Sequence, residues 1–102
     1  MEYNKICFDL DGTLCETNDI DYNGAKPKLD RIKKVNKLYD SGITIIIDTA
    51  RGSSTGLDWR KLTESQLKEW GVKYHILRTG LKIDADLFVD DKGINDNNFF
   101  KI

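Results

Sequence analysis

The stretch Ile6-Cys7-Phe8-Asp9-Leu10-Asp11-Gly12-Thr13 decides how the rest of this chain is interpreted. It opens with a short apolar run, which is typical of a buried strand, and the polar residues that follow cannot continue that strand through a core. The two carboxylates therefore lie where the strand leaves the sheet, at the edge where open α/β sheets bind ligands. Asp9 and Asp11 are close enough to repel each other unless a cation or a shared proton lies between them. The stretch predicts a magnesium-centred site with one ionised aspartate and one that can carry a proton.

Length and composition limit the class of protein. The 102 residues predict a single domain spanning residues 1–102, and 39% hydrophobic with 32% charged residues is ordinary for a globular protein. Sixteen basic residues nearly balance 17 acidic ones, which disfavours nucleic acid and membrane surfaces as partners. No apolar run is long enough to span a bilayer, and the first residues do not resemble a signal peptide. We expect a cytoplasmic protein with reduced cysteines.

Segments typical of strands and helices alternate along the chain. Apolar and β-branched runs predict strands over residues 4–9, 43–47, 72–77 and 85–89. Amphipathic spacing predicts one helix from Pro27 to Gly42 and another over residues 58–70. This alternation predicts an α/β fold, in which a parallel sheet is connected by right-handed crossovers. Two polar loops, residues 16–26 and 52–58, follow the first two strands, and we expect both to rim the site.

Four groups of residues resemble, in order, the motifs of the haloacid dehalogenase superfamily, whose members are mostly phosphohydrolases. They are Asp9-Leu10-Asp11-Gly12-Thr13, the run over residues 43–47 leading to Thr49, Lys82 before the last predicted strand, and Leu87-Phe88-Val89-Asp90-Asp91. The resemblance implies a three-layer Rossmann-like sheet with helices on both faces, with the first strand between the fourth and the second. Because only loops follow the first two motifs, the chain resembles the small members that lack a cap domain.

The resemblance also implies catalytic roles. Asp9 would be the nucleophile and form an aspartyl-phosphate, while Asp11 would protonate the leaving oxygen and then deprotonate the attacking water. Lys82 would pair with Asp9 and with the phosphoryl group as a fixed charge. Thr49 would donate its hydroxyl to a phosphoryl oxygen.

Further residues would bind the metal and the substrate. The family pattern implies that Mg²⁺ is held by the Asp9 carboxylate, the Asp11 backbone carbonyl, Asp90 and Asp91. Ala50 and Arg51, directly after Thr49, would contact the substrate, although a structural role for Arg51 is an equal alternative.

The leading hypothesis is a magnesium-dependent phosphomonoesterase that acts on a small phosphorylated metabolite. A sugar phosphate is the expected substrate class, because residues 49–52, 69–74 and 85–92 resemble small phosphatases of capsule and lipopolysaccharide biosynthesis. The alternatives are a phosphatase for nucleotides or nucleic-acid ends, a phospho-acceptor signalling domain and a catalytically silent binding module. A second subunit is one way to cover a capless site, so a homo-oligomer stays open.

Overall fold

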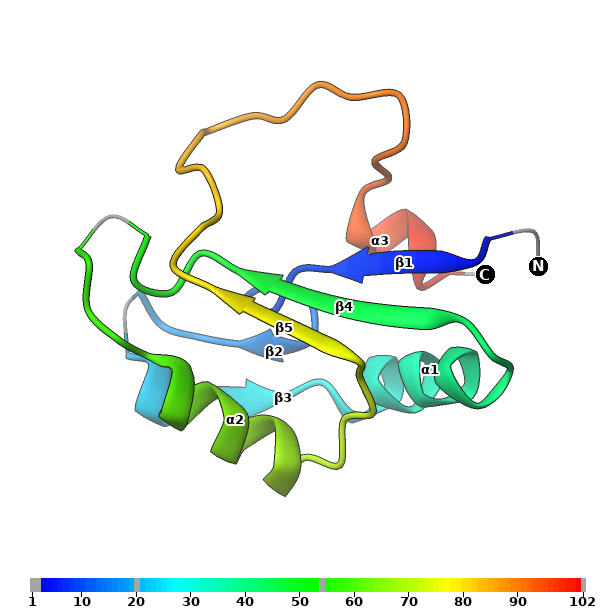
Figure 1. Ribbon diagram of the computed structural model, residues 1–102, viewed down its shortest axis with the longest axis horizontal. Coiled ribbons are helices and arrows are strands. Elements are labelled where there is room, and N and C mark those ends of the chain that lie inside the picture. The colour runs from blue at the N-terminus through cyan, green and yellow to red at the C-terminus, as the bar shows by residue number, and fades with distance from the viewer. Residues whose placement is uncertain (1–2, 20, 54, 102) are drawn as a thin grey trace.

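The computed structural model describes residues 3–19, 21–53 and 55–101, and strands alternate with helices along it (Figure 1). Residues 20 and 54, one in each of the two predicted rim loops, lie outside the described residues. The strands are β1 (Lys5–Phe8), β2 (Cys15–Glu16), β3 (Lys26–Pro27), β4 (Thr44–Thr49) and β5 (Ile76–Thr79). The helices are the 3₁₀ turn η1 (Tyr22–Gly24), α1 (Leu29–Asp40), α2 (Arg60–Glu69) and α3 (Asp96–Phe99).

The main sheet is parallel and has the order β1-β4-β5, which confirms the predicted α/β class. All three strands point the same way in Figure 1, so their carboxyl ends share one edge of the sheet. The register aligns Phe8 with Ile47 and Ile47 with Leu77, and all three side chains are buried in one row. Strands β2 and β3 form a separate antiparallel pair that closes the predicted loop over residues 16–26 into a hairpin.

The described helices cover one face of this sheet, so the prediction of helices on both faces is wrong. Phe99 and Phe100 at the end of α3 contact Phe8, whose face is also the one covered by α1. On the opposite face Cys7 and Ile76 are exposed. The order β1-β4-β5 runs in a single direction, and right-handed crossovers then place both connecting helices on the same side. The result is a two-layer arrangement.

The fourth strand predicted over residues 85–89 does not form. These residues belong to an exposed segment between β5 and α3 that arches away from the sheet in Figure 1, and Val89 is 90% exposed. A parallel strand needs a crossover of about a dozen residues to return to the other end of the sheet. Only residues 80–84 separate β5 from the predicted strand, and β1 therefore remains at the edge of the sheet.

The third strand begins later than predicted, at Ile76. The Val72 N–H closes the end of α2 by donating to the Leu67 carbonyl, 2.9 Å away. His75 makes two hydrogen bonds with Ile45. Its N–H donates to the Ile45 carbonyl, and its ring Nδ1 accepts from the Ile45 N–H. The ring takes the place of a backbone carbonyl, so regular pairing starts one residue later.

Among the described helices, none has the length and apolar character needed to cross a membrane.

Candidate active site

The polar residues after β1 form a tight turn, which backbone hydrogen bonds and two buried leucines hold in place. The Leu10 carbonyl accepts hydrogen bonds from the N–H groups of Thr13, Leu14 and Cys15 at 3.1, 2.8 and 3.2 Å. The side chains of Leu10 and Leu14 are fully buried, and Gly12 adopts a φ of 84°, which favours glycine. Buried leucines and shared backbone bonds therefore hold the two aspartates at the carboxyl edge of the sheet.

Asp9 lies at the open side of this edge. Its Oδ1 is 3.1 Å from Lys82 Nζ, and the Thr13 hydroxyl donates to Oδ2 at 3.5 Å. The Asp9 side chain is 38% exposed and the Lys82 side chain 27%, so both groups are open to a solute. The structure thus brings Lys82 from beyond β5 to the aspartate that follows β1, the pairing that the family resemblance implies.

Asp11 faces inward and is heavily hydrogen-bonded. Arg51 binds it through two parallel bonds, Nε to Oδ2 and Nη2 to Oδ1, both 2.9 Å long. Thr17 donates to Oδ1 at 2.6 Å, and Cys15 Sγ lies 3.5 Å from the same oxygen. Burial alone would raise the pKa of the Asp11 carboxyl, but the hydrogen bonds and charge of Arg51, with the Thr17 bond, lower that pKa below its ordinary value. Asp11 is consequently held as a carboxylate in the free protein.

Arg51 is directed toward Asp11 instead of toward a substrate. Its side chain has no exposed surface, and Nη1 donates to Thr63 Oγ1 and Gln66 Oε1 at 3.2 and 2.6 Å. In this arrangement the geometry favours the structural role of Arg51, which was the equal alternative to the predicted substrate contact. Thr49, at the end of β4, is also buried, and its hydroxyl is 3.5 Å from Asp11 Oδ2. Ala50 is exposed beside it.

The predicted metal ligands do not come together. Asp90 and Asp91 lie in the exposed segment after β5, where Asp90 Oδ1 accepts a 2.6 Å hydrogen bond from the Lys92 N–H. Across the described parts of the chain, no group of three or more acidic, histidine or cysteine side chains could hold a metal ion. The donors present at the edge, Asp9 and the Asp11 carbonyl, do not amount to the predicted magnesium site, because the acidic pair is missing from it. The short connection after β5 is the physical reason.

The first predicted rim loop contacts the start and the buried side of α2. The Tyr22 and Trp59 rings are in edge-to-face contact, with their centroids 4.9 Å apart. Gln66 Nε2 donates to the Tyr22 carbonyl at 2.5 Å. Gly52 is buried with a φ of 84°, and a side chain there would collide with the Leu57 backbone carbonyl. The first loop is thus tied to α2 and the second is closely packed on itself, which makes the described residues of both a fixed rim.

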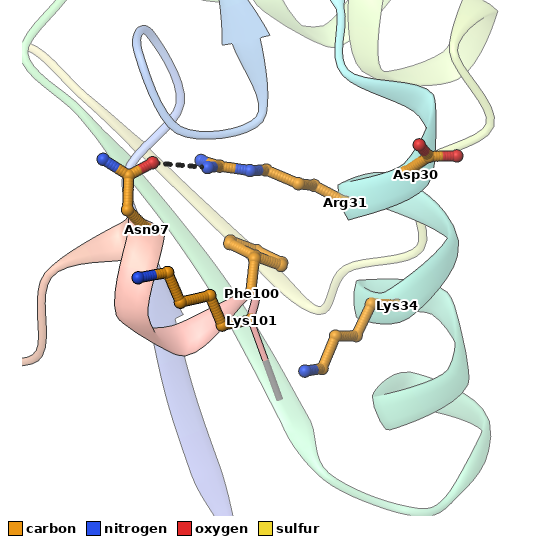
Figure 2. A pocket seen from close by; sticks show the side chains of 6 residues that line it. All are labelled: Asp30, Arg31, Lys34, Asn97, Phe100 and Lys101. Carbon is orange, nitrogen blue, oxygen red and sulfur yellow. Dashed lines mark hydrogen bonds between the residues drawn. The ribbon is translucent and has the colours of Figure 1, made fainter.

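An open groove of about 580 Å³ lies between α1 and α3, and neither Asp9 nor Asp11 lines it (Figure 2). Arg31 reaches across it and donates to Asp96 Oδ2 at 2.6 Å and to Asn97 Oδ1 at 2.9 Å, with its guanidinium over the Phe100 ring. The same guanidinium donates to the Thr13 carbonyl at 3.0 Å. Arg31 therefore fastens α3 to the turn after β1, and we assign this groove a structural role.

Sequence reasoning missed the residues that surround Arg51. Thr63 and Gln66 lie on the buried side of α2, four residues before apolar Leu67 and Trp70 respectively. Polar residues at such positions are a usable signal, because a buried polar group needs a hydrogen-bond partner. Thr17 carried no such signal, since its contact with Asp11 depends on the turn geometry.

Comparison with known proteins supports the fold. A crystal structure of a target protein from Vibrio cholerae, whose description names no activity, superposes with a TM-score of 0.86 at 26% sequence identity. The match covers 97% of this chain and 89% of that one. No protein-family model matches the chain, and no curated protein does. The similarity therefore extends to the architecture, and the chemistry must be argued from the residues.

Proposed function

We propose that this chain is a phosphomonoester hydrolase that forms an aspartyl-phosphate on Asp9. The observation that carries the proposal is the pairing of Asp9 with Lys82, 3.1 Å apart and both partly exposed, at the carboxyl edge of a parallel sheet. A carboxylate that is open to solute and has a fixed cation beside it can attack an anionic phosphoryl group. The second carboxylate, on Asp11, completes the pair that proton transfer requires.

In the first step an Asp9 carboxylate oxygen attacks phosphorus, and the bond from phosphorus to the leaving oxygen breaks. The electron pair of that bond goes to the leaving oxygen, which departs as an alcohol once it has gained a proton. Lys82 offsets the negative charge that gathers on the phosphoryl oxygens and on Asp9. Thr49 belongs to the proposal as the hydroxyl donor to a phosphoryl oxygen, which requires its hydroxyl to turn away from Asp11.

In the second step water attacks the phosphorus of the aspartyl-phosphate, and the bond between phosphorus and the Asp9 oxygen breaks. Asp9 returns as a carboxylate and inorganic phosphate leaves. Asp11 accepts the proton of the water, a role that suits a carboxylate held ionised by Arg51. Asp11 then releases this proton to solvent and returns to the carboxylate of the free protein. It takes one proton from solvent again when the next substrate binds and donates it to the leaving oxygen, so the cycle is balanced.

The proposal includes Mg²⁺ as a cation that the activity requires, and the steps above describe only what the chain's own residues do. When bound, Mg²⁺ would supply charge neutralisation at the phosphoryl group. Asp9 would offer its carboxylate and Asp11 its backbone carbonyl. Asp90 and Asp91 would join them only after the exposed segment over residues 83–95 moves.

A small phosphorylated metabolite such as a sugar phosphate is the proposed substrate. The rim formed around Tyr22 and Trp59 leaves the Asp9 side of the edge open, which suits a substrate held chiefly by its phosphoryl group. Nucleotides and nucleic-acid ends are the second candidate class, because an open site admits larger substrates. In a homo-oligomer, a second subunit would cover part of the open site.

The test is phosphate release from a generic aryl phosphate and from a panel of phosphorylated metabolites. Asp9→Asn should abolish release while circular dichroism stays unchanged, because the amide is nearly isosteric but a poor nucleophile. Asp30→Asn, which changes an exposed aspartate of α1, is the matched control and should retain activity. Wild-type turnover by Asp9→Asn would show that Asp9 is not the nucleophile.

A further inference from the structure

We propose that Arg51 is a positioning residue for Asp11, and that it presents Asp11 Oδ2 as the oxygen that exchanges protons. The inference rests on the proposed hydrolase activity and adds to it. Arg51 does not contact the substrate in this account. It acts by fixing the plane and the direction of one carboxylate.

The guanidinium is held from several sides, which makes it a rigid platform. Thr63 and Gln66 of α2 accept the two Nη1 bonds, and the Thr63 hydroxyl donates onward to the Trp59 carbonyl at 2.8 Å. The Tyr22 ring covers the guanidinium, with its centroid 4.7 Å from Cζ. Because its donors and one flat side are engaged in this way, the orientation of Arg51 is set by α2 and by the hairpin that contains Tyr22.

The two carboxylate oxygens of Asp11 therefore have different hydrogen-bond environments. Oδ1 lies near three donors, on Arg51, Thr17 and Cys15, which is more than the two lone pairs of one oxygen accommodate well. Oδ2 receives a 2.9 Å bond from Arg51 Nε and only a long 3.5 Å contact from Thr49. Oδ2 therefore retains capacity for a proton, and it is the oxygen on the side of Thr49.

The stability of the fold does not by itself explain the ion pair between Arg51 and Asp11. A buried arginine–carboxylate pair roughly breaks even against apolar residues of the same size, because both charges must be desolvated. Here only the carboxylate keeps contact with solvent, at 24% exposed, while the arginine has none. The pair is thus built so that a rigid buried cation presents an accessible carboxylate.

The kinetic test uses Arg51→Met and Arg51→Lys, with Arg60→Met as the control for loss of an arginine that does not contact Asp11. Arg51→Met should lower kcat for an aryl phosphate by about 100-fold and leave KM unchanged, because the phosphoryl group is held elsewhere. Arg51→Lys should recover part of kcat, since an ammonium can make one of the two bonds. Arg60→Met should match the wild type.

The decisive comparison repeats Arg51→Met in an Asp11→Asn background. Since Arg51 acts through Asp11, the second substitution should then change kcat little, and the urea midpoint should fall by less than the sum of the single losses. If Arg51→Met does not fold, Gln66→Met carries the test, because it removes an acceptor of Nη1 and leaves the pair with Asp11 in place. It should lower kcat by a smaller factor with KM unchanged.

Three results would overturn the inference. A rise in KM with kcat unchanged would make Arg51 a substrate ligand. Losses that multiply in the double variant would show that Arg51 acts independently of Asp11. Absence of Asp9-dependent hydrolysis in the wild type would remove the proposed function itself, and the Asp9→Asn control identifies that case.

Discussion

Replacing Lys82 by methionine removes the cation that the structure places against Asp9. The two atoms are 3.1 Å apart, and Coulomb's law at that separation gives about 1.3 kcal/mol in water and about 5 kcal/mol at an effective dielectric constant of 20. Because both side chains are about one-third exposed, the lower half of this range applies. Each 1.36 kcal/mol is tenfold in rate, so we expect kcat/KM to fall roughly 10- to 100-fold.

The assay is steady-state hydrolysis of an aryl phosphate at a fixed ionic strength. Lys82→Arg should retain more activity than Lys82→Met, and Lys61→Met, at an exposed position of α2, should behave as the wild type. The urea midpoint should move little in each variant, since partly exposed ion pairs stabilise a fold by at most about 1 kcal/mol. Activity of Lys82→Met within twofold of the wild type would refute the electrostatic role.

The remaining predictions concern stability, pH and metal. Leu10→Ala should lower the free energy of unfolding by about 2–5 kcal/mol in urea titrations, because Leu10 is fully buried, and exposed Leu57→Ala should change it little. The hydrogen bond from Arg31 holds the pKa of Asp96 below its ordinary value of 3.8, so this aspartate stabilises the fold above that pH and less as the pH falls through the lower value. The difference in urea midpoint between wild type and Asp96→Asn should therefore shrink below about pH 4, and a constant difference would contradict the assignment. A chelator should abolish hydrolysis, and Mg²⁺ should slow amide exchange over residues 83–91; activity that persists in chelator would remove magnesium from the proposal.

Local features of the site could be predicted from the sequence. The apolar run before Asp9 and the glycine after Asp11 indicate a strand that ends in a tight turn, and the structure has that turn. The continuous β-branched run of β4 and the helical spacing of α1 are similarly local signals. The alignment of parallel strands predicts Asp9, Asp11 and Thr49 at one edge of the sheet. The family resemblance implies Lys82 beside Asp9, and the structure has it there.

The remaining features depend on relations between elements. Residues 85–89 have the composition of a strand, but the connection that precedes them is too short for a parallel crossover, and composition does not register that constraint. Without that strand the direction of winding does not reverse, so a third layer has no place. The orientation of Arg51 depends on polar partners in α2, which a count of apolar positions passes over.

The most direct test of the central claim is to trap the intermediate. The protein is mixed with an aryl phosphate, quenched in acid within one turnover and reduced with borohydride, which converts an aspartyl-phosphate to homoserine. Mass spectrometry of the peptide that contains Asp9 then locates the modification. The account predicts homoserine at position 9 in the wild type and none in Asp9→Asn. Continued hydrolysis with position 9 unmodified, or modification at another aspartate, would contradict it.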